Sequence, residues 1–250
     1  MFPEGRRELI LRTLRRDGPA AVSSLAERLG VSQATIRRDL VQLDKEGRLS
    51  RVHGGAVAAA DTDDPFAEVA MQRVEEKDSI ASAAADLIRD GEAVLLDIGT
   101  TAHRFARTLH GRSLTVITSN LMVYEELKDD ADIQIVLLGG IVRRSYHSLV
   151  GFLTEDNLRQ VHADRLILGT SGVRPDGHVM DTTAVEVPLK RAMIAAADQV
   201  VLLADASKFP GTGIAKVCGP EDVDVVVTNG PIHSATGEAL RAADVEVVET

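Results

Sequence analysis

The 250-residue chain has one cysteine and no long apolar run, and each scarcity excludes a class of protein. A single cysteine, Cys218, cannot form an internal disulfide or build a cysteine-based zinc site. It follows Val217 in an apolar stretch, which predicts a buried side chain. No apolar run approaches the roughly 18 residues of a membrane-spanning helix, and the first residues are charged, unlike those of a signal peptide. We therefore expect a cytoplasmic protein that does not bind a membrane.

Positive charge is scarce in the chain as a whole but not in its first quarter. The formal net charge is −10. Residues 1–60 contain eleven Lys and Arg against seven Asp and Glu, a net charge of +4, so the remaining residues carry −14. A basic segment ahead of an acidic body places a polyanionic partner at the basic segment only. The charge changes across an Ala-rich, then acidic stretch, and we predict domains at residues 1–57 and 74–250 with a linker at residues 58–73.

A short amphipathic helix that turns arginines outward is the strongest pattern in the chain. Ser32 stands where an N-cap belongs, and Ile36, Leu40 and Leu43 follow at the spacing of one buried helical stripe. At about 100° per residue, Arg38 lies opposite that stripe. Small residues at the start of such a helix let it enter the DNA major groove, where arginines reach guanine or phosphate. A pair of arginines by itself is more often a solvated face, so the segments around the helix decide.

Those segments predict a winged helix-turn-helix. Residues 7–16 favour a first helix with apolar Leu9, Ile10 and Leu14, and residues 25–30 favour a supporting helix with a glycine turn. Gly47 stands at the position of a C′ glycine, and Arg48 to Val52 with Gly54-Gly55 would form the wing. This order of helices and wing is typical of DNA-reading domains. The residues predicted to contact DNA are Ser32, Gln33, Ala34, Thr35, Arg37, Arg38, Arg48, Arg51 and, against the DNA backbone, His53.

From about residue 74, short apolar runs alternate with stretches of helical length. The predicted strands are residues 93–97, 114–118, 133–138, 165–168, 200–204, 223–228 and 245–248. The predicted helices are residues 76–89, 102–110, 120–129, 184–197 and 234–243. Strands that are apolar throughout and separated by helices favour a parallel sheet covered on both faces. The predicted fold class is therefore α/β, with an N-terminal winged helix-turn-helix ahead of a mostly parallel sheet domain.

Polar residues and glycines follow five of these strands, at the sheet edge where parallel sheets bind ligands. Glycines let backbone amides approach a ligand, hydroxyls donate to phosphate oxygens, and a helix N-terminus adds positive potential. Arg143 and Lys208 can supply positive charge, whereas Asp97 suits a sugar hydroxyl or the orientation of Lys208. Each cluster alone is equally a turn, a helix cap, a solvated loop or a surface pair. Together they predict a site for a small anion, made of Asp97, Gly99, Thr100, Thr101, Thr118, Ser119, Asn120, Gly139, Gly140, Arg143, Gly172, Asp205 and Lys208.

The histidines show no spacing typical of metal ligands, so we predict no metal and no cofactor. His103 falls in the first turn after Thr101, where it is either an exposed helix residue or a contact to phosphate.

Both regions resemble the DeoR family of bacterial transcriptional regulators, and the resemblance covers nearly the whole chain. The matching blocks of the first region are Ser32-x-x-Thr35-Ile36-Arg37-Arg38-Asp39-Leu40, Leu43-x-x-x-Gly47 and Arg51-Val52-His53-Gly54-Gly55-Ala56. Those of the second are Asp97-x-Gly99-Thr100-Thr101, Thr118-Ser119-Asn120, Leu138-Gly139-Gly140, Ser148-x-x-Gly151, Ser171-Gly172, Glu186-Val187, Lys190-Arg191-Ala192-Met193-Ile194 and Leu203-Ala204-Asp205-x-Ser207-Lys208-Phe209. The chain departs from the family at Ala21, where a capping Ser or Thr is usual, and at Ser119, where many relatives have Asn.

The resemblance implies a non-enzymatic regulator, usually a repressor, of a carbohydrate operon. It implies operator DNA as one partner, a phosphorylated sugar or related metabolite as effector, and a dimer or larger oligomer. It also implies that the second domain resembles ribose-5-phosphate isomerase in fold, and it adds Lys190 to the effector-binding residues.

The alternative is a sugar-phosphate isomerase that carries an appended DNA-binding domain. Enolisation needs a general base beside the substrate carbon, and Asp97, Glu186 and Asp205 are candidates. Residues 163–165, Ala-Asp-Arg, stand where the isomerases have a more acidic cluster, which favours the regulator.

Overall fold

The computed structural model describes residues 3–17, 20–45, 48–52, 54–58 and 66–250. The chain divides into two compact units, Met1–Asp64 and Pro65–Thr250. Three sequence predictions lie outside the described residues: the C′ position of Gly47, the DNA contact of His53, and residues 59–65 of the linker.

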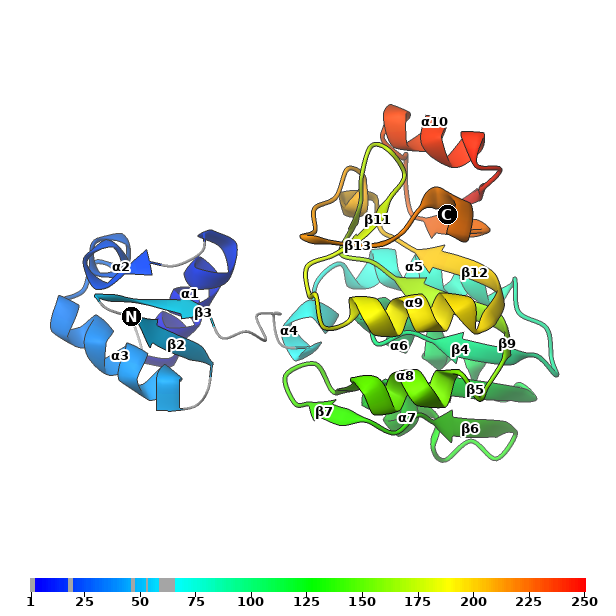
Figure 1. The fold of residues 1–250 in the computed structure, drawn as a ribbon, viewed down its shortest axis with the longest axis horizontal. Helices are drawn as coiled ribbons and strands as arrows, with labels where there is room; N and C mark the ends of the chain where they lie inside the picture. The colour runs from blue at the N-terminus through cyan, green and yellow to red at the C-terminus, as the bar shows by residue number, and fades with distance from the viewer. Residues whose placement is uncertain (1–2, 18–19, 46–47, 53, 59–65) are drawn as a thin grey trace. The chain divides into compact units, whose positions relative to one another are not determined.

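The described residues of the first unit form three helices and a small antiparallel sheet (Figure 1). The helices are α1 (Pro3–Asp17), α2 (Val22–Leu29) and α3 (Gln33–Lys45), and the sheet has the order β1 (Ala20–Ala21), β3 (Gly55–Ala58), β2 (Leu49–Val52). The core contains the predicted stripe of Ile36, Leu40 and Leu43. On α1, Ile10 and Leu14 are buried together with Leu11, whereas Leu9 is exposed. The predicted winged helix-turn-helix is therefore present, with Leu11 in the core and Leu9 outside it.

Glycines are needed in this unit at positions with a positive φ and at a close contact between two strands. Gly30 ends α2 in the left-handed region at φ 64°, and its amide donates to the carbonyls of Ala26 and Glu27. Gly54 also has a positive φ, 80°. A Cβ on Gly55 would collide with the carbonyl oxygen of Ala20, so the close approach of β1 and β3 requires glycine there.

The second unit is built on a seven-stranded parallel sheet that contains all seven predicted strands. Its order is β15 (Glu246–Glu249), β14 (Val225–Thr228), β12 (Ala197–Leu203), β9 (Ala163–Gly169), β4 (Ala93–Leu96), β5 (Leu114–Thr118) and β6 (Ile133–Leu137). Neighbouring residues of one strand enter different apolar clusters: Leu166 and Leu168 belong to one, and Ile167 belongs to the other. The sheet is therefore covered on both faces, as its uniformly apolar strands predict.

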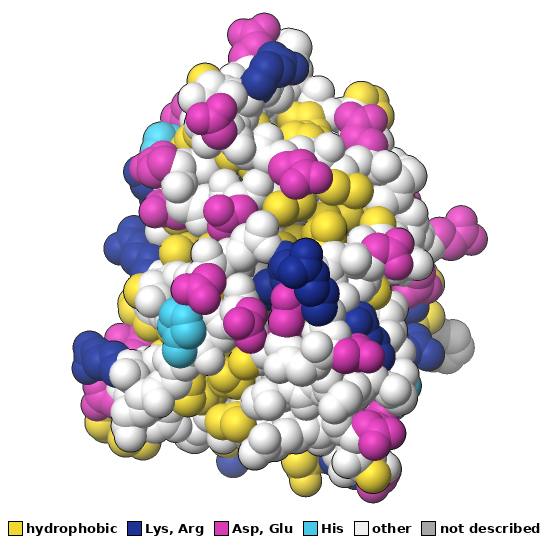
Figure 2. All heavy atoms as spheres, turned by 90° about the vertical axis from the view of Figure 1, so that its right-hand side faces the viewer, with side chains coloured by type: hydrophobic (Ala, Val, Ile, Leu, Met, Phe, Trp, Pro, Cys, Tyr) yellow, Lys and Arg dark blue, Asp and Glu magenta, His cyan; other side chains and the backbone are white. Residues whose placement is uncertain are grey.

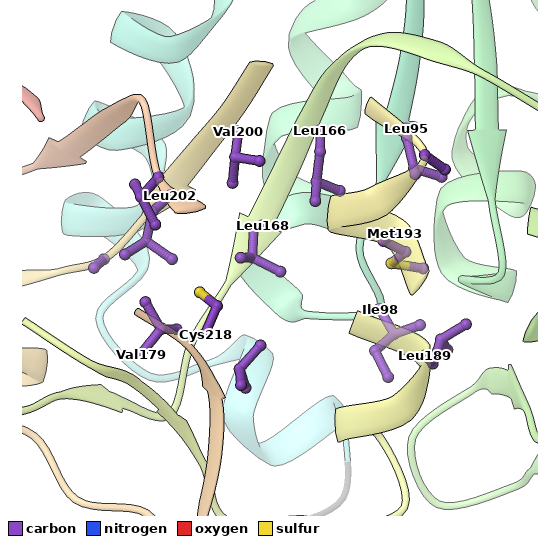
Figure 3. Close-up of a cluster of buried hydrophobic side chains, with 14 of the residues drawn as sticks. Leu95, Ile98, Leu166, Leu168, Val179, Leu189, Met193, Val200, Leu202 and Cys218 are labelled. Atoms are coloured by element: carbon purple, nitrogen blue, oxygen red, sulfur yellow. The ribbon is translucent and has the colours of Figure 1, made fainter. Parts of the chain in front are cut away.

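Helices form the two outer layers. One apolar cluster includes residues of α5 (Val74–Ala85), α6 (Thr100–Ala106) and α7 (Leu121–Leu127). The 3-10 turn Arg107–Leu109 directly follows α6. The other includes residues of α8 (Phe152–Leu158), α9 (Val187–Ala195) and α10 (Ser234–Ala242). Figure 3 shows Leu189 and Met193 of α9 beside sheet residues of this second cluster. A short helix, α4 (Phe66–Ala70), precedes α5.

Two small antiparallel elements were not predicted. One is the hairpin of β7 (Ile141–Arg143) and β8 (Ser148–Val150), and the other is a sheet of β10 (Gly172–Val173), β11 (Val179–Asp181) and β13 (Ala215–Cys218). The prediction that Cys218 is buried is confirmed, and burial raises the pKa of its thiol to about 12. The 3-10 turns Ala206–Lys208 and Pro220–Asp222 flank β13.

The surface of the second unit reflects its acidic composition. Figure 2 shows Asp and Glu side chains spread over one face of this unit, with basic side chains between them. Among the described residues, no helix has both the length and the apolar character that a membrane crossing requires.

Candidate functional sites

The outer face of α3 presents the predicted DNA-reading residues. The Ser32 hydroxyl accepts a hydrogen bond from the backbone amide of Thr35 at 3.2 Å, which confirms the predicted N-cap. Arg38 is exposed and has no hydrogen bond or ion pair within the described part of the chain. Arg37 is exposed as well, and its guanidinium donates to the amide oxygen of Gln33 at 3.3 Å. The helix therefore offers a polar face with an uncommitted arginine, flanked by exposed Ala34.

The two arginines of the wing region differ in whether their side chains are already bonded within the protein. Arg48 donates to the Glu8 carboxylate on α1 at 2.9 Å, so this guanidinium braces the wing against the helices. The side chain of Arg51 is exposed on β2, where a DNA backbone could reach it.

A buried carboxylate that the sequence analysis did not single out ties α3 to α1. Asp39 is almost fully buried. It accepts from the Nε atoms of Arg6 at 2.6 Å and Arg7 at 3.3 Å. Asp39 lies inside the Arg37-Arg38-Asp39 block, but its partners are more than thirty residues away. Sequence spacing gives no signal for such a contact.

In the second unit, Asp97 lies at the carboxyl end of β4 and is completely buried. Its Oδ2 atom accepts from the Lys190 ammonium at 2.8 Å and from the backbone amide of Gly169 at 2.9 Å. The suggestion that Asp97 orients Lys208 is therefore wrong, because Lys190 is the lysine that it binds. Its other oxygen, Oδ1, is buried and has no hydrogen-bond partner among the described residues.

Lys190 is buried on α9 between acidic side chains. Its ammonium also lies 3.2 Å from the Asp181 carboxylate and donates to the carbonyl oxygen of Gly169. Burial alone would lower the pKa of Lys190, but Asp97, Asp181 and Glu186 raise it above its ordinary value. The ammonium therefore stays charged and holds β4, β9 and β11 together at this edge. Asp181 was missed because the short strand that carries it was not predicted.

Arg143 and Glu186 form a second buried pair. The guanidinium also lies over the ring of Tyr146, 5.6 Å from its centroid. The alternative that Arg143 belongs to a solvated loop is therefore wrong. The pair connects the β7–β8 hairpin to the start of α9.

Several predicted site residues use their side chains for hydrogen bonds to the backbone at the carboxyl edge of the sheet. The Thr118 hydroxyl donates to the carbonyl of Leu96, and the Asn120 side chain donates to the carbonyls of Asp97 and Gly99. Asp205 caps the turn after β12 by accepting from the amide of Ser207 at 3.0 Å. No ion pair between Asp205 and Lys208 occurs among the described residues.

Two of the predicted glycines are required by packing inside the protein. A Cβ on Gly140 would collide with the Thr154 hydroxyl, and one on Gly172 would collide with the backbone of Gly211. The amide of Gly139 donates to Asn157 at 2.9 Å. A Cβ on Gly99, by contrast, would meet nothing within 4 Å. Gly99 therefore borders open space, where a ligand could approach its backbone.

The remaining predicted residues keep unused polar groups at the same edge. The Ser119 hydroxyl is buried without a partner among the described residues. Thr100 and Thr101 make no side-chain hydrogen bond, and half-buried Lys208 makes none either, within the part of the chain described. These groups follow β5, β4 and β12 within one parallel sheet. His103 is half-buried rather than exposed, and it contacts Glu126 at 3.2 Å.

Two family models match the chain. The DeoR-like helix-turn-helix domain matches residues 6–62, and the DeoR C terminal sensor domain matches residues 72–230.

Curated relatives match this chain over most of their length. The HTH-type transcriptional regulator GolR of Listeria innocua is 33% identical, over 99% of this chain and 98% of its own. The glycerol-3-phosphate regulon repressor of Escherichia coli is 34% identical over 89% of each chain. Among solved structures, ribose 5-phosphate isomerase A of Methanocaldococcus jannaschii matches 55% of each chain at 18% identity, with a TM-score of 0.41.

Proposed function

The chain belongs to the DeoR family of transcriptional regulators, and we propose that its second unit binds a phosphorylated sugar or a related metabolite. The chain is thus a DNA-binding regulator with a helix-turn-helix and a sensor domain. The relatives include a repressor of a glycerol-3-phosphate regulon. By that analogy, this chain represses an operon of carbohydrate metabolism and responds to a phosphorylated metabolite.

The observation that carries the proposal is the set of unused polar groups where β4, β5 and β12 end. Lys208 supplies a positive charge, and the hydroxyls of Thr100 and Thr101 supply donors for phosphate oxygens. The buried Oδ1 of Asp97 accepts a hydrogen bond from a sugar hydroxyl. An unpaired buried oxygen costs stability, so a ligand hydroxyl there recovers part of that cost. Occupation of this site shifts the protein between two states that differ in operator affinity.

We propose that the regulator is not an isomerase. The base candidates Asp97 and Glu186 are each bound to a buried cation, Lys190 and Arg143, and Asp205 caps its own turn. A general base must take up the substrate proton, and protonation of Asp97 or Glu186 would leave the buried cation beside it without its compensating charge. Incubation of the full-length protein with ribose 5-phosphate should therefore yield no ribulose 5-phosphate, and catalytic formation of that product would contradict the proposal.

A thermal-shift panel of sugar phosphates identifies the ligand. A ligand at about 100 times its dissociation constant stabilises the native state by about 2.7 kcal/mol. Fluorescence anisotropy with operator DNA then measures whether the hit releases or recruits the protein.

Two variants of the site should separate sensing from DNA binding. Thr100→Val with Thr101→Val, and separately Lys208→Ala, should weaken the hit about tenfold to a hundredfold, because each removes donors that contribute about 1.5–3 kcal/mol when charge-assisted. Operator affinity without ligand should stay unchanged. Thr115→Val, at the opposite end of β5, is the matched control. Loss of DNA binding together with early melting would instead make these residues structural caps.

A further inference from the structure

An exposed apolar surface lies at the β6 end of the large sheet. Five large apolar side chains there are between 38% and 65% exposed: Leu137, Ile141, Val142, Phe152 and Leu153. They come from the end of β6, from β7 and from the first turn of α8, elements that Figure 1 shows at one end of the second unit. We call this set the β6–α8 surface. Apolar patches on soluble proteins often mark an interaction site.

Printed contacts between the segment after β6 and α8 show that the set is continuous. The backbone amide of Gly139 donates to the side chain of Asn157 on α8 at 2.9 Å. The Cδ1 atom of Ile141 lies 3.3 Å from the position that a Cβ on Gly151 would take, directly before Phe152. The chain from β6 to β7 therefore lies against α8, and the exposed side chains of these elements are neighbours.

The two edges of the seven-stranded sheet differ in how they are protected from association. The edge strand β15 carries exposed Glu246 and Glu249. The opposite edge strand is β6, and the sequence from Ile133 to Val142 contains no charged residue. Charged side chains on an edge strand are a common protection against pairing with another chain. The β6 edge lacks that protection, which favours a contact there.

The distribution of charge favours a second copy of this chain as the partner. Residues 61–250 carry a net charge of −14, so two copies repel each other where their acidic surfaces meet. In a two-fold contact each copy presents the same patch to the other, so an uncharged patch suits it. Exposed charges of both signs flank the surface, Arg144 after β7 and Asp156 with Arg159 on α8. A two-fold contact can bring such opposite charges together.

The size of the surface fits such a contact as well. A standard interface buries about 800 Å² of each partner. Five large apolar side chains, each roughly half exposed, offer on the order of 400 Å² of apolar area. That is about the apolar share of a typical interface, whose remainder is a polar rim.

We propose that the β6–α8 surface joins two copies of this chain in solution through a two-fold contact. The inference goes beyond the proposed effector binding and does not rest on it, because none of the five side chains belongs to the proposed effector site.

Sedimentation velocity of the full-length protein, from nanomolar to micromolar concentration, tests the proposal. The wild type should form a dimer or a larger assembly. Phe152→Glu and Ile141→Glu should each raise the dissociation constant about hundredfold or more, because a two-fold contact buries each new carboxylate twice. Ile214→Glu, at an 81% exposed position before β13, is the matched control and should associate as the wild type does.

Phe152→Ser guards against a folding defect in the glutamate variants. It adds no charge and should also weaken association, with a far-UV circular dichroism spectrum like that of the wild type. A wild type that stays monomeric at every concentration would overturn the proposal. An assembly that survives both glutamate substitutions would overturn it too, because the copies would then be joined elsewhere.

The second readout is amide hydrogen exchange in residues 137–142. Exchange there should slow as the concentration of the wild type rises, and it should not depend on concentration in Phe152→Glu. Slow exchange at every concentration in a monomeric wild type would mean that the chain covers this surface itself, which would contradict the proposal. Thermal shifts of the same variants with sugar phosphates test effector binding separately, so the proposed function can fail while this surface stands.

Discussion

Buried charges in the second unit are of two kinds, which differ in how far other protein groups compensate them. Lys190 and Arg143 lie against carboxylates, so their charges are compensated within the protein. The Lys77 ammonium donates to a carbonyl instead, and burial together with nearby Lys208 lowers its pKa to about 8, although Asp205 opposes that shift. A buried ion pair contributes little net stability but is costly to break, whereas a buried, poorly paired ammonium is a standing cost. Lys77 therefore marks a position that stability alone does not explain.

Replacing Lys77 should reveal this cost as a function of pH. Between its native pKa of about 8 and its ordinary value of 10.5, the unfolded chain binds more protons than the folded protein, so wild-type stability rises with pH through that window. Below pH 8 Lys77 is charged in both the folded and the unfolded protein, so the folded protein bears the full cost of burying the ammonium. Lys77→Met should thus be more stable than the wild type by about 3 kcal/mol at pH 7, with a difference that narrows towards pH 10. Urea unfolding at several pH values measures it, and a gap independent of pH would contradict the expectation.

Arg38 is the residue whose loss should matter most for operator recognition. It is exposed opposite the buried stripe of α3. Arg38→Ala should cost about 1–3 kcal/mol of operator affinity and relax the sequence preference if the guanidinium reads a base. Anisotropy titrations with operator and scrambled DNA measure both effects. Arg89→Ala, an exposed arginine of the second unit, should change neither. An equal loss on both DNAs, with a weaker salt dependence, would assign Arg38 to a phosphate instead.

At the scale of elements, the sequence predicts the strands and caps that depend on residues close together in the chain. The seven sheet strands could be found because each is an apolar run between helices, and the cap of α3 because Ser32 has a specific preference for that position. The strands β7, β8, β10 and β11 have two or three residues each, too few to show a period. Contacts such as Lys190 with Asp97, which are 93 residues apart, arise from the chain topology and leave no local pattern.

The link between α1 and α3 leads to a prediction about the stability of the DNA-binding unit. Asp39→Asn removes the charge that binds Arg6 and Arg7 but keeps the shape of the side chain. Breaking an ion pair leaves the nearly buried side chain of residue 39 facing uncompensated arginines, so the amides of α1 and α3 should exchange faster, with the second unit unchanged. Asp44→Asn, on the exposed side of α3, is the control. Unchanged exchange in Asp39→Asn would mean that the arginines find other partners at no cost.

At the scale of the whole molecule, the two units differ in the sign of their net charge. Residues 1–60 carry +4 and the remainder −14, so attraction to DNA comes from the first unit and the acidic second unit is repelled by it. One small unit neutralises few phosphates. We therefore propose that the second unit holds an oligomer together and that operator affinity comes mainly from two or more DNA-binding units on one assembly.

The isolated first unit should accordingly bind operator DNA far more weakly than the full chain. Residues 1–64 have their own apolar core, built around Ile10, Leu25 and Ile36. Linked units gain from effective concentration, a factor of about 10² to 10⁴, and the full chain should also show the steeper loss of affinity with salt because more phosphates are neutralised. Anisotropy titrations of both proteins over a salt series, with sedimentation of the full chain, measure these effects. Equal affinities at matched salt would mean that one unit suffices, and the proposed oligomer would then have no role in DNA binding.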